Sequence, residues 1–186
     1  MNKRERLWVV GFIASWTLFL CSLAWFNGFA NLFVLLVVTT SLGIFYSSHI
    51  MARLQIESMI KHFQQTNNLR NLAAEYVFLG IYYTNEGNKK KSLECAQKAL
   101  SLLEPTEEWA VKSMALYHLG GEYLELGNTL DAEHYLELSL EAGEKARDRN
   151  ACIVAMEKLA ELHRKTGNRE QEKFFVEKIK SIDNAI

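Results

Sequence analysis

Histidine and cysteine are the side chains from which metal sites and nucleophilic catalysts are most often built, so their spacing is the first test for chemistry. The five histidines are His49, His62, His118, His134 and His163. They form no H-x-x-x-H or H-E-x-x-H pattern, which would place two imidazoles on one face of a helix. The sequence therefore predicts no metal site.

The three cysteines, Cys21, Cys95 and Cys152, are far apart and form no C-x-x-C pair, which is typical of free thiols in a reducing compartment. No G-x-S-x-G occurs, and Gly120-Gly121 is not followed by the Lys-Ser or Lys-Thr of a phosphate-binding loop. These patterns predict a protein that is not an enzyme, with no cofactor and no small-molecule substrate. The net charge of -1 creates no field that would attract nucleic acid, so no nucleic-acid partner is expected.

The dipeptide Gly-Asn occurs three times at a spacing of forty residues, at Gly87-Asn88, Gly127-Asn128 and Gly167-Asn168. Apolar residues at helical spacing flank each copy. A glycine in the left-handed conformation ends a helix, and an asparagine caps the start of the next one. The sequence therefore predicts an all-α repeat domain over residues 69–186, with helix–turn–helix units at about 69–104, 105–148 and 149–186.

The frame Leu-Gly-x-x-Tyr upstream of Gly-Asn, at Leu79-Gly80 and Leu119-Gly120, resembles the tetratricopeptide repeat family, in a variant of about forty residues. The resemblance implies a solenoid of helix pairs, in which the glycine of Leu-Gly lets the two helices of a unit pack closely. Ala160 stands at this position in the third unit and departs mildly from the pattern.

The same resemblance implies a groove lined by the first helices of successive units, where a protein partner binds. The family's groove positions correspond to Val77, Ile81, Asn85, Met114, Tyr117, His118, Leu124, Glu125, Glu157, Lys158 and Glu161. Burial of some of these side chains against the juxtamembrane helix is the alternative interpretation. The small residue expected early in each second helix is Ser92 or Ala132, but Glu172 in the third unit, which implies a worn, solvent-capping last unit.

No Asp, Glu, Lys or Arg lies between Arg6 and Arg53. Leu7–Phe26 and Ala30–Ser48 are each long enough to cross a hydrocarbon core of about 30 Å, so residues 1–48 are predicted to form a transmembrane helical hairpin. The aromatic residues expected to anchor it are Trp8, Trp16, Trp25, Phe33 and Tyr46. Basic residues flank the hairpin, which predicts both termini and the repeat domain on the cytoplasmic side. A cleaved signal peptide is the alternative for the first span.

Residues 49–68 are predicted to form a juxtamembrane helix and a connection, with Asn68 capping the helix that follows. Together these features predict a membrane-anchored scaffold or assembly factor, which binds membrane-associated protein partners through its groove at the surface of the lipid bilayer. The alternative is a stable accessory subunit of a membrane protein complex, bound through the hairpin.

Overall fold

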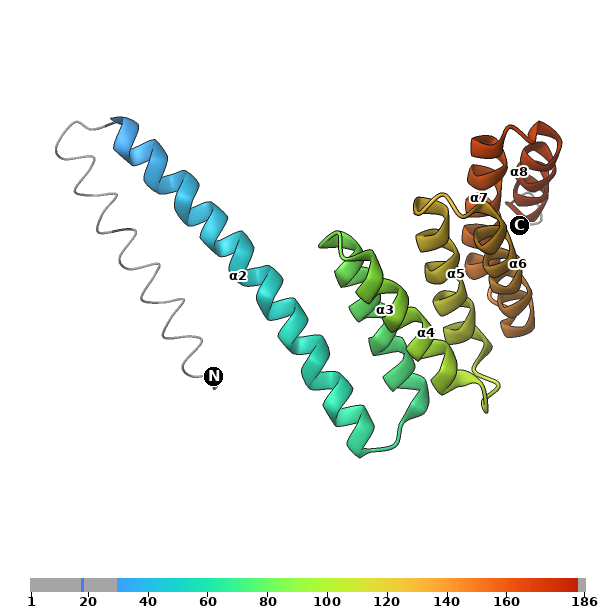
Figure 1. Cartoon of the computed structure of the whole chain (residues 1–186), viewed down its shortest axis with the longest axis horizontal. Coiled ribbons are helices and arrows are strands. Elements are labelled where there is room, and N and C mark those ends of the chain that lie inside the picture. Colours follow the sequence, from blue (N-terminus) through green and yellow to red (C-terminus); the bar gives the residue numbers. More distant parts are fainter. Residues whose placement is uncertain (1–17, 19–29, 184–186) are drawn as a thin grey trace. The chain divides into compact units, whose positions relative to one another are not determined.

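The computed structural model describes residue 18 and residues 30–183. All the regular secondary structure in this part of the chain is α-helical (Figure 1). The chain divides into two compact units, Met1–Ala52 and Arg53–Ile186. Helix α2 (Ala30–Gln65) extends across the boundary, and the later helices all lie in the second unit.

Helices α3 to α8 begin at intervals of twenty residues and follow one another as pairs (Figure 1). They are α3 (Leu69–Asn85), α4 (Lys89–Leu103), α5 (Trp109–Glu125), α6 (Thr129–Ala146), α7 (Arg149–Thr166) and α8 (Arg169–Asp183). The forty-residue period of the sequence thus corresponds to one pair of helices. This part of the prediction, an all-helical repeat, is confirmed.

The turn within each helix pair combines a left-handed residue with a capping side chain. Gly87, Gly127 and Gly167 have φ angles of 73°, 78° and 78°. Nothing lies within 4 Å of the position where a Cβ would be attached, so the backbone conformation, not crowding, favours glycine at these positions. The asparagine after each glycine accepts a hydrogen bond from the backbone N–H three residues later, which satisfies one of the free amides of the new helix.

Two further turns have the same form without glycine. Asn67 and Arg147 adopt φ angles of 52° and 53°, and the residues that follow them cap the next helix. Asn68 accepts from the N–H of Asn71 at 3.1 Å, which confirms the predicted cap, and Asp148 accepts from the N–H of Ala151 at 3.0 Å. The connection from α4 to α5 differs, because it contains Pro105 and its cap residue makes no side-chain hydrogen bond.

Three apolar clusters fill the interior of the second unit. The first joins the end of α2 to α3 and α4 and includes Ile60, Leu72 and Leu79. The second joins α3 and α4 to α5, and the third joins α5 and α6 to α7 and α8. Each cluster draws on consecutive helices, so every helix pair is stabilised by its neighbours, as in stacked repeats.

The glycine of each Leu-Gly frame lies at a close approach between helices. A Cβ on Gly120 would stand 2.8 Å from Leu136 Cγ on α6, the second helix of the same pair. A Cβ on Gly80 would stand 2.7 Å from Nε2 of His118, which belongs to α5 of the next pair. Gly120 therefore fulfils the role implied by the family resemblance, whereas Gly80 makes room for the following pair.

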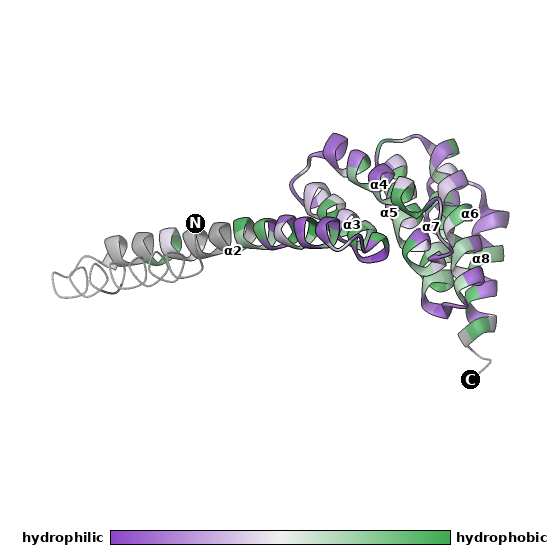
Figure 2. Cartoon of the chain, turned by 90° about the horizontal axis from the view of Figure 1, so that it is seen from below, coloured by the Kyte–Doolittle hydropathy of each residue, from purple (hydrophilic) through white to green (hydrophobic). Residues whose placement is uncertain are grey.

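The predicted transmembrane hairpin requires a correction. In the part of the chain that the structure describes, no helix combines the length and the apolar character needed to cross a membrane. The predicted second span, Ala30–Ser48, is part of α2, which continues without a break to Gln65 through the charged residues Arg53, Glu57 and Lys61. Figure 2 shows hydrophilic residues along this later half of the helix.

The fold class with a two-span hairpin, and the localisation as an integral membrane protein, are therefore wrong as predicted. The first span, Leu7–Phe26, lies outside the described residues except for residue 18. So do the predicted anchoring residues Trp8, Trp16 and Trp25, and the structure does not describe the side chains of Phe33 and Tyr46.

Candidate protein-binding surface

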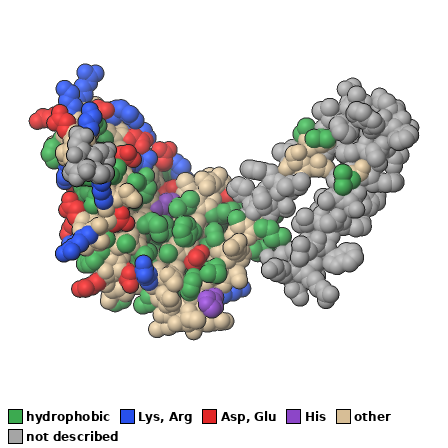
Figure 3. Space-filling view, turned by 180° about the vertical axis from the view of Figure 1, so that it is seen from behind, with side chains coloured by type: hydrophobic (Ala, Val, Ile, Leu, Met, Phe, Trp, Pro, Cys, Tyr) green, Lys and Arg blue, Asp and Glu red, His purple; other side chains and the backbone are tan. Residues whose placement is uncertain are grey.

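Helices α3, α5 and α7 are the first helices of the three pairs, and α5 contacts both of the others. Phe78, Ile81 and Val154 are 47%, 39% and 39% exposed, and Met114 and Tyr117 are half-buried between them along the repeat. We call this set of five residues the first-helix face. Seen from behind, the second unit shows hydrophobic side chains in its middle and charged side chains toward its C-terminal end (Figure 3). Large apolar side chains exposed on successive repeats make these helices a candidate interaction site.

Two of the predicted groove residues lie in the core instead. Val77 is fully buried among Ala73, Ala99 and Ala115. Leu124 is buried in the cluster that includes Leu136. Neither side chain reaches the surface, because the neighbouring helix pair covers this side of the helix. Phe78, which the sequence argument omitted, is exposed instead of Val77.

The charged part of the predicted groove forms a network between α5 and α7. Lys165 Nζ lies 3.3 Å from a Glu125 carboxylate oxygen and 2.9 Å from one of Glu161, and Lys158 Nζ lies 2.7 Å from Glu161. The hydrogen bond from Lys158, followed by that from Lys165, lowers the pKa of Glu161 to about 2. The hydrogen bond to Glu161 in turn raises the pKa of Lys165. The side chains of the other two predicted polar residues, Glu157 and Asn85, are exposed.

His118 belongs to a polar cluster between the first two helix pairs. Its Nε2 lies 3.0 Å from Ser92 Oγ, and Ser92 Oγ lies 2.9 Å from Thr84 Oγ1. Thr84 donates a hydrogen bond to Oε1 of Glu122, a residue only 3% exposed. Burial lowers the pKa of His118, and the nearby charge of Glu122 opposes that shift. A neutral imidazole engaged in this way is part of the fold rather than of a binding surface.

Glu122 is the residue in this region that the sequence argument missed. Its other oxygen, Oε2, is buried and has no hydrogen-bond partner among the described residues. Its spacing of four residues from His118 was the available signal, because such pairs meet on one helix face.

No group of three or more His, Cys, Asp or Glu side chains within residues 18 and 30–183 could hold a metal ion. Burial raises the pKa of the Cys95 thiol to about 11, and burial also raises the pKa of Cys152. Because the thiolate is the reactive form, both cysteines are weak nucleophiles at neutral pH.

The repeat geometry has a counterpart among known families. Residues 76–102 match the family model of the tetratricopeptide repeat. The matched segment runs from within α3 to near the end of α4, and the other two pairs repeat its helix starts at intervals of forty residues. Tetratricopeptide repeats generally mediate protein–protein interaction and are typically non-catalytic. The matched repeat contains Phe78 and Ile81, two of the most exposed apolar side chains of the first-helix face. A comparison with curated proteins gave no match.

Proposed function

We propose that the second unit is a scaffold that binds a segment of a partner protein on its first-helix face. The observation that carries this proposal is the exposure of Phe78, Ile81 and Val154 on the first helices of a tetratricopeptide-like repeat. Burying such side chains on binding yields roughly 25 cal/mol for each Å² of apolar surface.

The positions of the charged residues on α5 and α7 indicate which residue types the partner segment should contain. On α3 the face presents the apolar Phe78 and Ile81. Helices α5 and α7 carry the Glu125–Lys165–Glu161–Lys158 network in addition to the apolar residues of the face. A segment with apolar side chains followed by polar or charged ones is therefore complementary to the face. The network pairs its own charges already, so it contributes orientation more than affinity.

Affinity purification of the tagged full-length chain from its native source tests the proposal. The test variant carries Phe78→Ser and Ile81→Ser, two exposed positions where the loss of an apolar side chain leaves the core intact. The matched control is Leu130→Ser on α6, because Leu130 is 80% exposed and lies outside the first-helix face.

We expect one set of partners with the wild-type chain and with Leu130→Ser, and a loss of at least about tenfold with the double variant, as for anchor residues at other interfaces. Equal recovery with the double variant would show that partners contact a different surface and would end the proposal.

A further inference from the structure

In each of the first two helix pairs, one surface is covered by the first helix of the next pair. The third pair has the corresponding surface, but none of the described helices packs on it. Along the second helices, Ala96 and Ala99 of α4 and Leu136 and Ser139 of α6 are completely buried. Helix α5 packs against α4, and α7 packs against α6, so the next first helix covers each of these surfaces. The residues forty positions further on are Val176 and Ile179 of α8. Val176 is 37% exposed and Ile179 is half-buried.

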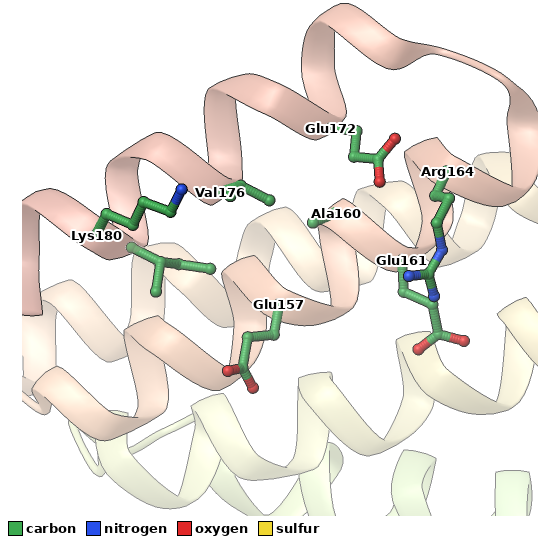
Figure 4. Close-up of a pocket in the computed structure, with 8 residues that line it drawn as sticks. Glu157, Ala160, Glu161, Arg164, Glu172, Val176 and Lys180 are labelled. Atoms are coloured by element: carbon green, nitrogen blue, oxygen red, sulfur yellow. The ribbon is translucent and has the colours of Figure 1, made fainter.

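These residues line a groove of about 420 Å³ between α7 and α8. Ala160, Val176 and Ile179 supply its apolar part. The charges around it come from Glu157, Glu161 and Arg164 of α7 and from Glu172 and Lys180 of α8. Figure 4 shows Val176 and Glu172 of α8 pointing toward the side of α7 that carries Ala160. We call this site the α7/α8 groove. No helix within the described residues covers it.

The corresponding surfaces of the first two pairs, which α5 and α7 cover, indicate which side chains a helix bound in this groove would carry. At the first of these surfaces, His118 of α5 contacts Ser92, and Glu122 of α5 accepts a hydrogen bond from Thr84. The repeat places Glu172 at the position of Ser92 and Arg164 at the position of Thr84. A helix that docks like α5 therefore meets an acidic residue where His118 lies and a basic residue where Glu122 lies.

The floor of the groove adds two requirements. Ala115 of α5 and Ala155 of α7 are both completely buried, so the docked helix needs a small residue where it crosses the pair. Ala160 takes the place of Gly80, where a Cβ would stand only 2.7 Å from the His118 ring. Lysine, whose flexible chain can bend around that methyl group, fits better than histidine at this position.

We propose that the α7/α8 groove binds an amphipathic helix of a partner protein, with the pattern small residue, lysine three positions later, and an acidic residue four positions after the lysine. The lysine pairs with Glu172 and the acidic residue pairs with Arg164. Among the described helices, α5 carries a related pattern in Ala115, His118 and Glu122, and α7 carries Ala155 and Lys158 but has Leu162 in place of the acidic residue. Both helices already pack against the preceding pair through these faces. The occupant is therefore a different protein rather than a described helix of a second copy.

The probe is a fluorescein-labelled peptide with the α5 sequence, residues 109–125, in which His118→Lys has been introduced. Fluorescence anisotropy measures its binding to the full-length chain. We expect saturable binding to the wild type and a loss of at least about tenfold with Val176→Asp, because a carboxylate replaces a floor side chain. Phe174→Asp is the matched control, since Phe174 lies on the same helix, is 53% exposed and does not line the groove.

A charge exchange tests the orientation of the helix. Glu172→Lys should weaken the lysine peptide by about two- to fivefold, and a peptide with Glu at the same position should recover that loss. Phe78→Ser with Ile81→Ser should leave peptide binding unchanged, which separates this site from the first-helix face.

Three results would overturn the proposal: no saturable binding to the wild type, equal binding to Val176→Asp, or self-association of the chain that Val176→Asp abolishes. Sedimentation of both chains without peptide measures the last, which would make the groove an interface between copies.

Discussion

The junction between the first and second helix pairs and the junction between the second and third use the same positions for opposite chemistry. In the first junction these positions hold Thr84, Ser92, His118 and Glu122. In the second they hold Leu124, Ala132, Lys158 and Leu162. The first junction buries a polar network, whereas the second buries apolar side chains and directs its one charged residue into the surface network with Glu161.

The comparison separates the geometry of the repeat from the interactions that stabilise it. Both junctions join helices in the same register, so the backbone arrangement accepts either chemistry. The apolar junction gains about 1.5–3 kcal/mol for a fully buried leucine. The polar junction instead depends on each hydrogen bond, and a buried polar atom without a partner costs about 1–3 kcal/mol. Glu122 Oε2 is such an atom within the described part of the chain.

Placing a carboxylate like that of Glu122 at the matching position of the second junction should cause the largest loss of stability. Leu162 is 1% exposed and packs with Leu124 and Ala132. Leu162→Glu places a carboxylate there without the hydroxyl donor that Glu122 has, so we expect a loss of about 3–5 kcal/mol in the free energy of unfolding. Urea denaturation followed by circular dichroism measures it.

The reciprocal change, Glu122→Leu, is the control for that experiment. It removes the unsatisfied oxygen together with one hydrogen bond, so stability should change by less than about 1 kcal/mol. If the two substitutions cost the same, the distinction between the junctions would not hold.

Replacing Gly120 or Gly80 by alanine should reduce the stability by less, and the two losses should differ. In Gly120→Ala the new methyl group meets Leu136 and, at 3.2 Å, the backbone oxygen of Ala132, which cannot move easily. We expect a loss of about 1–3 kcal/mol. Gly80→Ala should cost less, because its nearest neighbour is the tip of the His118 side chain.

Thermal unfolding of Gly80→Ala in the presence and absence of His118→Ala checks the assigned clash. The second substitution should recover part of the stability lost in the first. Additive losses would mean that His118 is not the obstacle.

The polar junction should make stability depend on pH near the histidine pKa. The folded pKa of His118 lies below the reference value of 6.5, so the unfolded chain binds more protons between the two values. The stability contributed by neutral His118 is therefore present above pH 6.5 and is lost as the pH falls through 6.5 toward the folded pKa. The slope is limited to about 1.4 kcal/mol per pH unit for one proton.

Urea unfolding at about pH 7.5 and about pH 5.5 measures this dependence, and His118→Gln should reduce it. His134→Gln is the matched control, because His134 is exposed. Glu161 does not interfere in this range, since its lowered pKa concerns only more acidic solutions. An unchanged pH dependence in His118→Gln would contradict the role assigned to the cluster.

The smallest effect is expected in the surface network that replaces the polar cluster at the second junction. Glu161→Gln leaves Lys158 and Lys165 without their shared partner, but both lysines remain accessible to water. We expect a loss of about 0.2–1 kcal/mol, which falls further in about 1 M salt because the charges are screened. A loss that is independent of salt would indicate a packing effect instead.

The period and the main turns were predictable because glycine and asparagine have distinct backbone roles. Gly87, Gly127 and Gly167 mark left-handed residues, and each following asparagine marks a helix start. The twenty-residue spacing of the helix starts could not be recognised in the sequence, because Asn67 and Arg147 adopt the same left-handed conformation without being glycine. Side chains other than glycine adopt that conformation when the rest of the fold compensates for it.

The candidate surface was predicted less well than the fold. The family register assigned Val77 and Leu124 to a groove, but both are buried, and it omitted Phe78, which is exposed. One sequence shows which residues share a helix face and not which face the next pair covers. The continuation of the predicted second span as a helix to about Gln65 agrees with α2, but its role as a membrane span does not hold. Among the described residues, no helix combines the length and the apolar character needed to cross a membrane.

The equal spacing of the helix starts has a consequence for how the gene can change. Any forty-residue segment that begins at the start of α3, α4, α5 or α6 contains two complete helices. Duplication or deletion of such a segment adds or removes a pair and returns the chain to the same phase. The protein can therefore gain or lose a helix pair in discrete steps. Each new junction can carry its own side chains, because the polar and apolar junctions of this chain share one register.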